Sequence, residues 1–339
     1  MSLPRHPPMQ PGWIDAPHQV AALGPMPLES GAVLDDLRVS YVVHGDLQDT
    51  SRPVVLGLCA IGSTHHRLDF LIGAGRALDP ARHTIIVVDA LGNGLSSSPS
   101  NSATQPREQF PRFTIGDMVR SQKLLLDSLH VTSLHAIIGA SMGGMQALQW
   151  GVSFPDFMSH LIALVPMAKT TPWSQTLNAA SRLALRQAGA ESGTEFDWSA
   201  WVAINHILAM RSPTRFAADV GNEGMQAWLT RRTQWWQQQQ ADPLDWIYQS
   251  WAYDDHDVGT TPGFAGDTDR ALAAIKARTM IAVPRIDLYN PVEEGIRTAR
   301  HIPDCRLVQL ASNDGHLATS DADPKAARQL GAEIIAFLA

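Results

Sequence analysis

The sequence has few cysteines, little charge and no long apolar run. Its two cysteines, Cys59 and Cys305, exclude a disulfide framework and a cysteine-based metal site. Charged residues are 17% of the 339 residues and the formal net charge is −7 without any basic block, so neither nucleic acid nor an anionic membrane is expected as a partner. No window reaches the roughly 18 apolar residues of a membrane span. We therefore expect a globular protein in a reducing compartment, with a small molecule as its substrate.

The first residues also lack the apolar core of a secretory signal. Residues 1–12 are rich in proline instead, and we expect a cytoplasmic protein. No group of histidine, cysteine and acidic residues has the spacing of a metal site. Residues 92–96 lack the lysine and the final glycine of a phosphate-binding loop. The sequence therefore predicts no metal and no cofactor.

Two stretches of the chain alternate between short apolar runs and helical patterns. Apolar runs at 54–58, 84–89 and 134–138 in the first stretch, and at 279–283 in the second, have the length of buried strands. A helix is expected over 66–78, after the first of these runs. Because strands that alternate with helices form parallel βαβ units, the sequence predicts an α/β fold with a mostly parallel, doubly wound sheet.

Between these stretches lies a segment without strand-like runs. Residues 169–266 have helical patterns and contain eight of the ten tryptophans. We interpret this segment as a helical insertion over the active edge of the sheet. The predicted domains are an α/β core of residues 28–166 and 267–339, a helical lid insertion of residues 167–266, and an extended N-terminal arm of residues 1–27.

The most informative motif is Gly-Ala-Ser-Met-Gly at residues 139–143, a G-x-S-x-G pentapeptide between a predicted strand and a predicted helix. Strand, tight turn and helix are the context of a nucleophile elbow. Such a turn strains the backbone of the serine and brings neighbouring chain close, so glycines at 139 and 143 keep bulky Cβ atoms away. The alternative is an ordinary strand-to-helix connection. We predict Ser141 as a catalytic nucleophile.

A serine hydroxyl needs a base to remove its proton, and the base needs an orienting carboxylate. In this type of fold the acid and then the histidine follow the serine along the chain, each after the end of a strand. Asp287 follows the strand that ends at Val283, and His316 lies in a glycine-containing loop after Leu310. We predict Asp287 as the orienting acid and His316 as the base. Asp314 is a rival acid, but it lies only two residues before the histidine.

Acyl transfer also needs two backbone N–H groups that bind the oxyanion. The residue after the nucleophile, Met142, is predicted to supply one. The turn after the apolar run at 54–58 supplies the other. Ala60 is the first choice and Ile61 the second, because small residues in this turn leave the backbone accessible.

Side chains near the same turn are candidate substrate contacts. Ile61 borders the turn, and His65 and His66 follow it, although packed or solvated histidines are the alternative for both. Asp89 ends the next strand, and we expect it to cap and orient the loop that follows. The tryptophans of the insertion are expected to pack between helices, with some of them lining an acyl pocket.

Four segments around these residues match one known family. They are the elbow and its helix, GASMGGMQALQW, the turn at 62–65, the acid loop at 286–291 and the Gly315-His316 pair. In these segments the chain resembles the homoserine O-acetyltransferase family of the α/β-hydrolase superfamily. The resemblance implies the α/β-hydrolase fold and an enzyme in which Ser141 accepts an acyl group from a thioester, with acetyl-CoA as co-substrate. It also implies a homodimer through the lid helices, and it makes Arg211 the candidate for an arginine that holds the amino acid.

One loop departs from that family. Its transferases have a glycine-rich, cysteine-containing loop with Ser-Thr-Gly-Pro after the strand that ends here at Asp89. Residues 90–99 are ALGNGLSSSP instead, nearer the Gly-x-Gly-x-Ser of hydrolases. We therefore expect a serine enzyme that hydrolyses a small ester or amide through an acyl-Ser141 intermediate. The alternatives are an acyl-CoA-dependent O-acyltransferase of homoserine or a similar alcohol, and a hydrolase-fold protein that only binds a ligand.

Overall fold

The computed structural model describes residues 6–187, 197–239 and 241–339, and eight strands in these ranges form one sheet. The strand order is β1-β2-β4-β3-β5-β6-β7-β8. Strand β2 is antiparallel to its neighbours β1 and β4, whereas the strands from β4 to β8 are parallel to one another. The predicted α/β fold with a mostly parallel, doubly wound sheet is therefore confirmed. The strands are β1 (His18–Pro27), β2 (Val33–His44), β3 (Val54–Leu58), β4 (Thr84–Val88), β5 (Leu134–Ala140), β6 (Met158–Leu164), β7 (Arg278–Val283) and β8 (Cys305–Gln309).

The central strands are mostly apolar because both faces of the sheet are covered. Val55 belongs to one buried apolar cluster and Leu56 to the other, and the same alternation separates Ile138 from Ile137. Continuous apolar runs are typical of parallel strands buried on two faces. This explains why these strands were predictable from short runs without a polar face.

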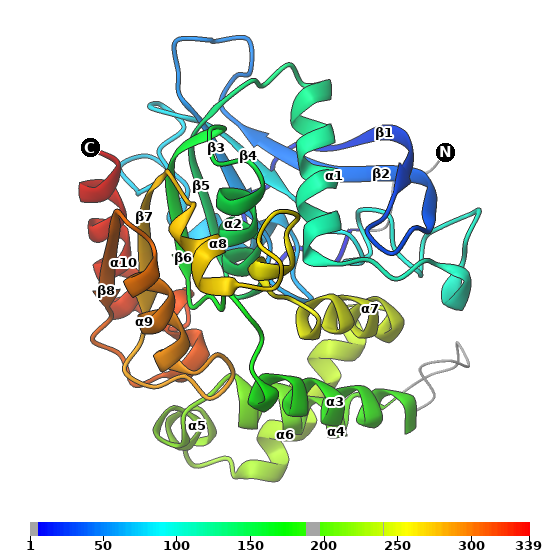
Figure 1. Ribbon diagram of the computed structural model, residues 1–339. Coiled ribbons are helices and arrows are strands. Elements are labelled where there is room, and N and C mark those ends of the chain that lie inside the picture. The colour runs from blue at the N-terminus through cyan, green and yellow to red at the C-terminus, as the bar shows by residue number, and fades with distance from the viewer. Residues whose placement is uncertain (1–5, 188–196, 240) are drawn as a thin grey trace.

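Helices cover the two faces unequally. One face carries α1 (Ile115–Ser128), α2 (Met142–Ser153), α8 (Thr268–Ala273) and α9 (Val292–His301), whose apolar side chains join the larger cluster. The other face carries the 3-10 helix η1 (His65–Leu71) and α10 (Pro324–Leu338). Figure 1 shows α1 and α2 in front of the sheet and α10 at its far edge.

Two details differ from the sequence expectation. The expected helix over 66–78 is the short η1 instead, because Gly73 and Gly75 adopt positive φ angles of 142° and 73° that end a helix. The expected N-terminal arm of residues 1–27 contributes β1 to the sheet. Its prolines suggested chain outside the sheet, yet β1 is an edge strand, where a residue without an N–H is tolerated.

The segment after β6 forms a group of helices at one end of the sheet (Figure 1). Rings of Trp198, Trp201, Trp236 and Trp246 pack against one another there, with centroid separations of 4.9 to 5.5 Å. The expectation that tryptophans pack between the helices agrees with this arrangement. These helices, called the lid below, are α3 (Pro172–Gln187), α4 (Ser199–Val202), the π-helix η3 (Ala203–Ala209), α5 (Pro213–Val220), α6 (Met225–Gln238) and α7 (Pro243–Asp254).

The described helices include none with the length and apolarity required to cross a bilayer.

Candidate active site

The predicted nucleophile lies on a strained turn between β5 and α2. Ser141 has φ 58° and ψ −122°, a region that residues with a side chain rarely adopt. Its backbone N–H donates to Leu164 O, and its carbonyl accepts from Met145 N. These bonds to β6 and to the first turn of α2 hold the strained conformation.

The two glycines of the elbow are required by close backbone contacts. A Cβ on Gly139 would lie 2.2 Å from the Gly143 carbonyl oxygen, and a Cβ on Gly143 would lie 2.5 Å from the Leu58 carbonyl oxygen. Real Cβ atoms do not approach backbone oxygens so closely. The start of α2 therefore packs directly against the end of β3.

The predicted acid and base meet at the carboxyl ends of β7 and β8. The distance from His316 Nδ1 to Asp287 Oδ2 is 2.8 Å, and both side chains are buried. The other carboxylate oxygen, Oδ1, accepts the backbone N–H groups of Tyr289 and Asn290 at 2.8 and 3.0 Å. A carboxylate that accepts these bonds leaves Nδ1 of His316 as the donor, so Nε2 carries a free lone pair.

Two polar atoms of the site lack a hydrogen-bond partner among the residues that the structure describes. They are Ser141 Oγ and His316 Nε2, and both are buried. The Tyr289 ring lies 5.2 Å from the His316 ring and stacks on Tyr253 at 5.5 Å. Burial, with Tyr289 and Asp287 nearby, raises the pKa of Tyr253 well above its usual value, while the hydrogen bond that its hydroxyl donates to Asn290 opposes the shift. A hydroxyl and an unused imidazole nitrogen in such surroundings are suited to proton transfer.

The predicted oxyanion donors come from the two elements that meet at Gly143. Ala60 follows β3, and Met142 begins α2. Within the described ranges, neither of their N–H groups donates to a protein acceptor. Gln146 Nε2 donates to Cys59 O at 3.1 Å and to Met142 O at 3.2 Å, which fixes the two backbones relative to each other. Sequence reasoning missed Gln146, although its polar side chain on a buried helix face was a usable signal.

The lid also holds the turn that contains Ala60. Gln249 on α7 accepts the Gly62 N–H at 2.8 Å and donates to Leu91 O at 3.0 Å. This amide connects the lid to the turn after β3 and to the loop after β4. Gln249 gave no sequence signal, because its partners lie more than 150 residues away in the chain.

A second lid contact secures the histidine loop. Arg215 on α5 pairs with Asp314 at 2.5 Å, and the Ser212 hydroxyl donates to Asn313 O. A Cβ on Gly315 would lie 2.8 Å from the Ser212 backbone nitrogen. The rival acid Asp314 is therefore occupied by Arg215, and Asp287 is the carboxylate that contacts His316.

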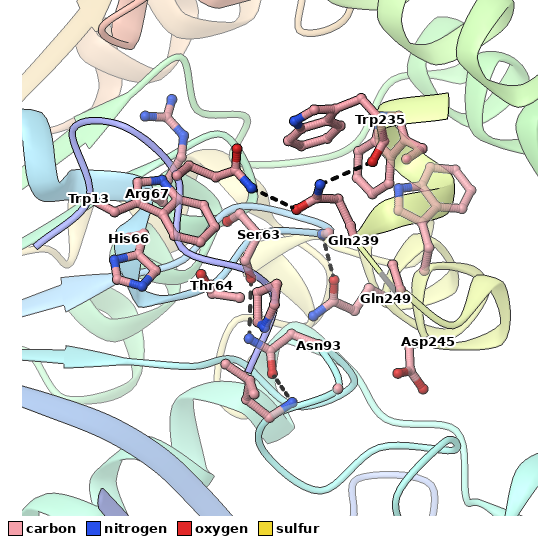
Figure 2. Close-up of a pocket in the computed structure, with 18 of the residues that line it drawn as sticks. Trp13, Ser63, Thr64, His66, Arg67, Asn93, Trp235, Gln239, Asp245 and Gln249 are labelled. Carbon is pink, nitrogen blue, oxygen red and sulfur yellow. Dashed lines mark hydrogen bonds between the residues drawn. The ribbon is translucent and has the colours of Figure 1, made fainter. Parts of the chain in front are cut away.

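A cavity of about 770 Å³ lies beside the turn after β3 (Figure 2). Gly62 and Ser63 line it on the core side, whereas Ser141 and His316 do not line it. Its polar lining includes Arg232, whose Nε is buried and finds no hydrogen-bond partner in the described part of the chain. Burial, with Arg211 and Arg231 nearby, lowers the pKa of Arg232 to about 10. The other lining residues come from the N-terminal arm, η1, the loop after β4, the lid and residues 320–321, and they include Trp13, His66, Asn93, Trp198, Trp235, Trp236 and Trp246.

The predicted substrate contacts have different surroundings. Ile61 is half-buried in the turn next to Ala60. His65 donates its backbone N–H to Asp89 Oδ1 at 2.8 Å and contacts Asp89 Oδ2 through Nδ1 at 2.9 Å. Arg211 pairs with Asp219 at 2.7 Å and donates to His206 O, so its predicted contact with an amino acid receives no support from this geometry. None of the three lines the cavity, whereas His66, the other histidine considered with them, does.

Asp89 organises the loop after β4, as expected for it. Besides the bonds from His65, its carboxylate accepts a hydrogen bond from the Asn93 side-chain amide at 3.0 Å and one from the Ser40 hydroxyl at 2.5 Å. Burial alone would raise the pKa of Asp89, but hydrogen bonds from His18, His65 and Ser40 hold it well below its usual range. The carboxylate thus stays ionised inside the protein and anchors the loop.

Comparison with known proteins identifies the family of the fold. The model of the alpha/beta hydrolase fold family matches residues 57–323. The chain belongs to this family. It is 29% identical over 95% of both chains to an ethyl acetate hydrolase from Pseudomonas veronii, and 29% identical to a homoserine O-acetyltransferase from Nostoc punctiforme over 86% of this chain and 88% of the relative. The structure of the acetyl esterase MekB superposes with a TM-score of 0.87 at 29% identity, covering 95% of this chain and 96% of that one.

These relatives confirm three predictions made from the sequence. The fold is that of the α/β hydrolases, the protein is an enzyme, and the resemblance to homoserine O-acetyltransferases is real. The individual site residues, the domain boundaries and the homodimer stay predictions.

The elbow contacts predict a steric effect on stability. We expect Gly143→Ala to lower the free energy of unfolding by about 2 kcal/mol or more, because its Cβ would overlap the Leu58 carbonyl and overpack the turn. Gly331→Ala in α10 is the matched control. It meets nothing within 4 Å, and alanine in a helix interior gains about 0.5–1 kcal/mol over glycine. Urea unfolding of both variants checks this, and equal stability of the two would contradict it.

Asp245 in the cavity wall predicts a dependence of stability on pH. Burial, and then the charge of Asp242, raises its pKa from 3.8 to about 8, although Ser100 donates two hydrogen bonds to it. The folded protein binds this proton more tightly than the unfolded chain does. The free energy of unfolding of wild type therefore falls as the pH rises from about 4 to about 8. We expect Asp245→Asn to gain stability relative to wild type up to about pH 8, with a constant difference above it.

Urea unfolding at a series of pH values measures this difference for Asp245→Asn. Asp255 is exposed just after α7, and Asp255→Asn serves as the control. It should leave the dependence of the unfolding free energy on pH as it is in wild type. A difference for Asp245→Asn that stays constant with pH would refute the assignment.

Proposed function

We propose that this protein hydrolyses small esters, acetyl esters among them, through an acyl-Ser141 intermediate. One observation carries the proposal: His316, oriented by Asp287, has a buried Nε2, Ser141 on its strained elbow has a buried hydroxyl, and neither atom has a hydrogen-bond partner in the described part of the chain. Burial of unpaired polar atoms costs free energy, so their retention favours a chemical role over a packing role.

In the proposed mechanism His316 Nε2 accepts the Ser141 proton while Oγ bonds to the ester carbonyl carbon. The carbonyl electron pair moves onto oxygen, and the N–H groups of Met142 and Ala60 bind the resulting oxyanion. Collapse breaks the ester C–O bond, and the imidazolium returns its proton to the leaving alkoxide. Water then attacks the acyl-serine with His316 again as base, which releases the acid and restores Ser141.

Two observations favour hydrolysis over transfer to an alcohol. The loop at 90–99 has the hydrolase-like sequence, and a hydrogen bond from the Asn93 amide to the buried Asp89 carboxylate fixes it to the end of β4. Relatives named as ethyl acetate hydrolase and probable esterase align over 95% and 90% of this chain. The acyl-CoA-dependent transferase remains the second candidate, because a homoserine O-acetyltransferase aligns over 86% of the chain. Acetyl-CoA would be its co-substrate.

The cavity fits a small ester. Ligand sites commonly measure about 300–1,000 Å³ and combine an apolar lining with a few polar groups. Here tryptophans from the lid provide the apolar wall, and Gly62 and Ser63 lead toward the oxyanion turn. We propose that substrates enter along this wall and that the lid limits the size of the acyl and alcohol groups.

Asp287→Asn tests the role of the acid. Because Tyr289 and Asn290 would still donate to the Oδ1 position, the amide NH₂ of the substituted side chain would face His316 Nδ1 and require the wrong tautomer. We expect kcat on 4-nitrophenyl acetate to fall about 10⁴-fold, as in other triads. Asp314→Asn is the control and should retain kcat within about tenfold. A loss confined to Asp314→Asn would overturn the assignment of Asp287.

Ser141→Ala separates the three functional candidates. A fluorophosphonate probe is expected to label wild type and the control Ser159→Ala, an exposed serine of β6, but not Ser141→Ala. Ethyl acetate hydrolysis should fall at least about 10⁴-fold in Ser141→Ala. Release of CoA from acetyl-CoA only when homoserine is present would favour the transferase. Absence of labelling in wild type would favour a protein that only binds its ligand.

A further inference from the structure

A cluster of imidazoles lies outside the proposed catalytic site, where the N-terminal arm meets η1. His6 belongs to the arm, and His65 and His66 begin η1. Their ring centroids are 4.2 to 5.2 Å apart, and one ligand atom from each residue lies within 4.8 Å of the other two. Two segments that are distant in the sequence therefore place three histidines around one point.

The δ-nitrogen of each ring contacts an oxygen that can only accept. His66 Nδ1 lies 2.6 Å from Asp69 Oδ2, His65 Nδ1 lies 2.9 Å from Asp89 Oδ2, and His6 Nδ1 lies 2.7 Å from the Pro7 carbonyl. A carboxylate or carbonyl partner makes Nδ1 the donor in all three rings. Nε2 then carries the lone pair.

This arrangement creates a conflict between His6 and His66. Their Nε2 atoms are 3.0 Å apart, and two lone pairs at that distance repel unless a cation lies between them. Either one extra proton or a metal ion relieves the conflict. Imidazoles whose Nδ1–H groups donate to carboxylate or backbone oxygen are typical of metal sites, since this bond fixes the tautomer and the ring orientation.

We propose that His6, His65 and His66 bind one Zn²⁺ ion through Nε2. Zinc takes imidazole nitrogens at about 2.0–2.1 Å in tetrahedral sites, which places two such nitrogens about 3.3 Å apart. The observed 3.0 Å between His6 and His66 needs a shift of only a few tenths of an ångström. Three nitrogen ligands select zinc or a neighbouring late transition metal over Mg²⁺ or Ca²⁺, which prefer oxygen. A water molecule completes the tetrahedron.

A second group of ligand atoms nearby is less suited to a metal. His18, His65 and Asp89 also approach one another closely. However, Asp89 Oδ2 already accepts from Ser40 and from His65, and His18 Nε2 contacts the Ser40 hydroxyl. Its ligand atoms are thus engaged within the protein, whereas the Nε2 atoms of His6 and His66 contact only each other among the residues that the structure describes.

The site would attach the arm to the wall of the cavity. The Trp13 ring stacks on His66 with centroids 4.1 Å apart, and Pro7, Gly12 and Trp13 line the cavity beside Ser63 and Thr64 (Figure 2). A zinc ion shared by His6 and η1 would hold this part of the arm over the cavity. The proposal does not depend on the chemistry assigned to Ser141.

Zinc binding to the full chain tests the proposal. After treatment with a chelator and desalting, wild type incubated with Zn²⁺ should retain one zinc per chain by elemental analysis. Co²⁺ in place of Zn²⁺ should give the visible absorption of a tetrahedral complex. Zinc should also raise the melting temperature of wild type, because a preformed site binds it more tightly than the unfolded chain does. His6→Ala should lose stoichiometric zinc and this rise, with affinity at least 100-fold weaker.

Two further measurements keep the test decisive. His130→Asn removes an exposed histidine that follows α1, outside the cluster, and should bind zinc as wild type does. Nitrogen NMR of histidine-labelled wild type should show the Nε2 resonances of three histidines shifting with zinc, independently of any variant. Absence of zinc from wild type, equal zinc affinity in His6→Ala, or unshifted Nε2 resonances would overturn the proposal, and would indicate that a proton alone joins His6 and His66.

Discussion

The site depends on one close backbone contact, that between the start of α2 and the end of β3. Gly143 allows the nucleophile turn to approach the Leu58 carbonyl, where a Cβ would lie at 2.5 Å. This approach brings Met142 close to the turn that contains Ala60, the other proposed oxyanion donor, and Gln146 joins the two segments by donating to the carbonyls of Cys59 and Met142. Strain at Ser141 is tolerated because bonds to β6 and α2 hold the turn from both sides.

The lid helices contact the loops that carry the proposed catalytic groups. Gln249 joins α7 to the turn after β3, and Arg215 joins α5 to the histidine loop at Asp314. Both contacts cross from the lid to loops of the core that carry proposed catalytic groups. A change in the lid can therefore alter oxyanion binding or the orientation of His316 without touching the substrate.

The N-terminal arm closes a third side of the cavity. Trp13 stacks on His66, and Gln10 contacts Gln239 at the end of α6, so the arm bridges the core and the lid. The loop after β4 completes the wall, held by the buried charge of Asp89. Arm, loop and lid thus surround a space that the eight-stranded sheet alone would leave open.

The sequence by itself determined the chemistry-bearing positions that follow local rules. The G-x-S-x-G elbow, the order serine, acid and histidine, and the alternation of strands with helices depend on steric limits and periodicity within short segments. These rules identified Ser141, Asp287 and His316 as candidates and predicted the parallel sheet.

Only the tertiary structure decided which side chains from distant segments meet. In the folded protein Arg211 pairs with Asp219, and Gln249 bonds to two backbone groups of distant loops. Residues 18–27 pair with β2 as an edge strand, and His6 lies beside His66. Such contacts depend on how whole elements pack, and a histidine or glutamine has the same local signature whether it faces solvent, a partner or a metal. That is why the catalytic candidates were visible in the sequence, while their supports and the histidine cluster were not.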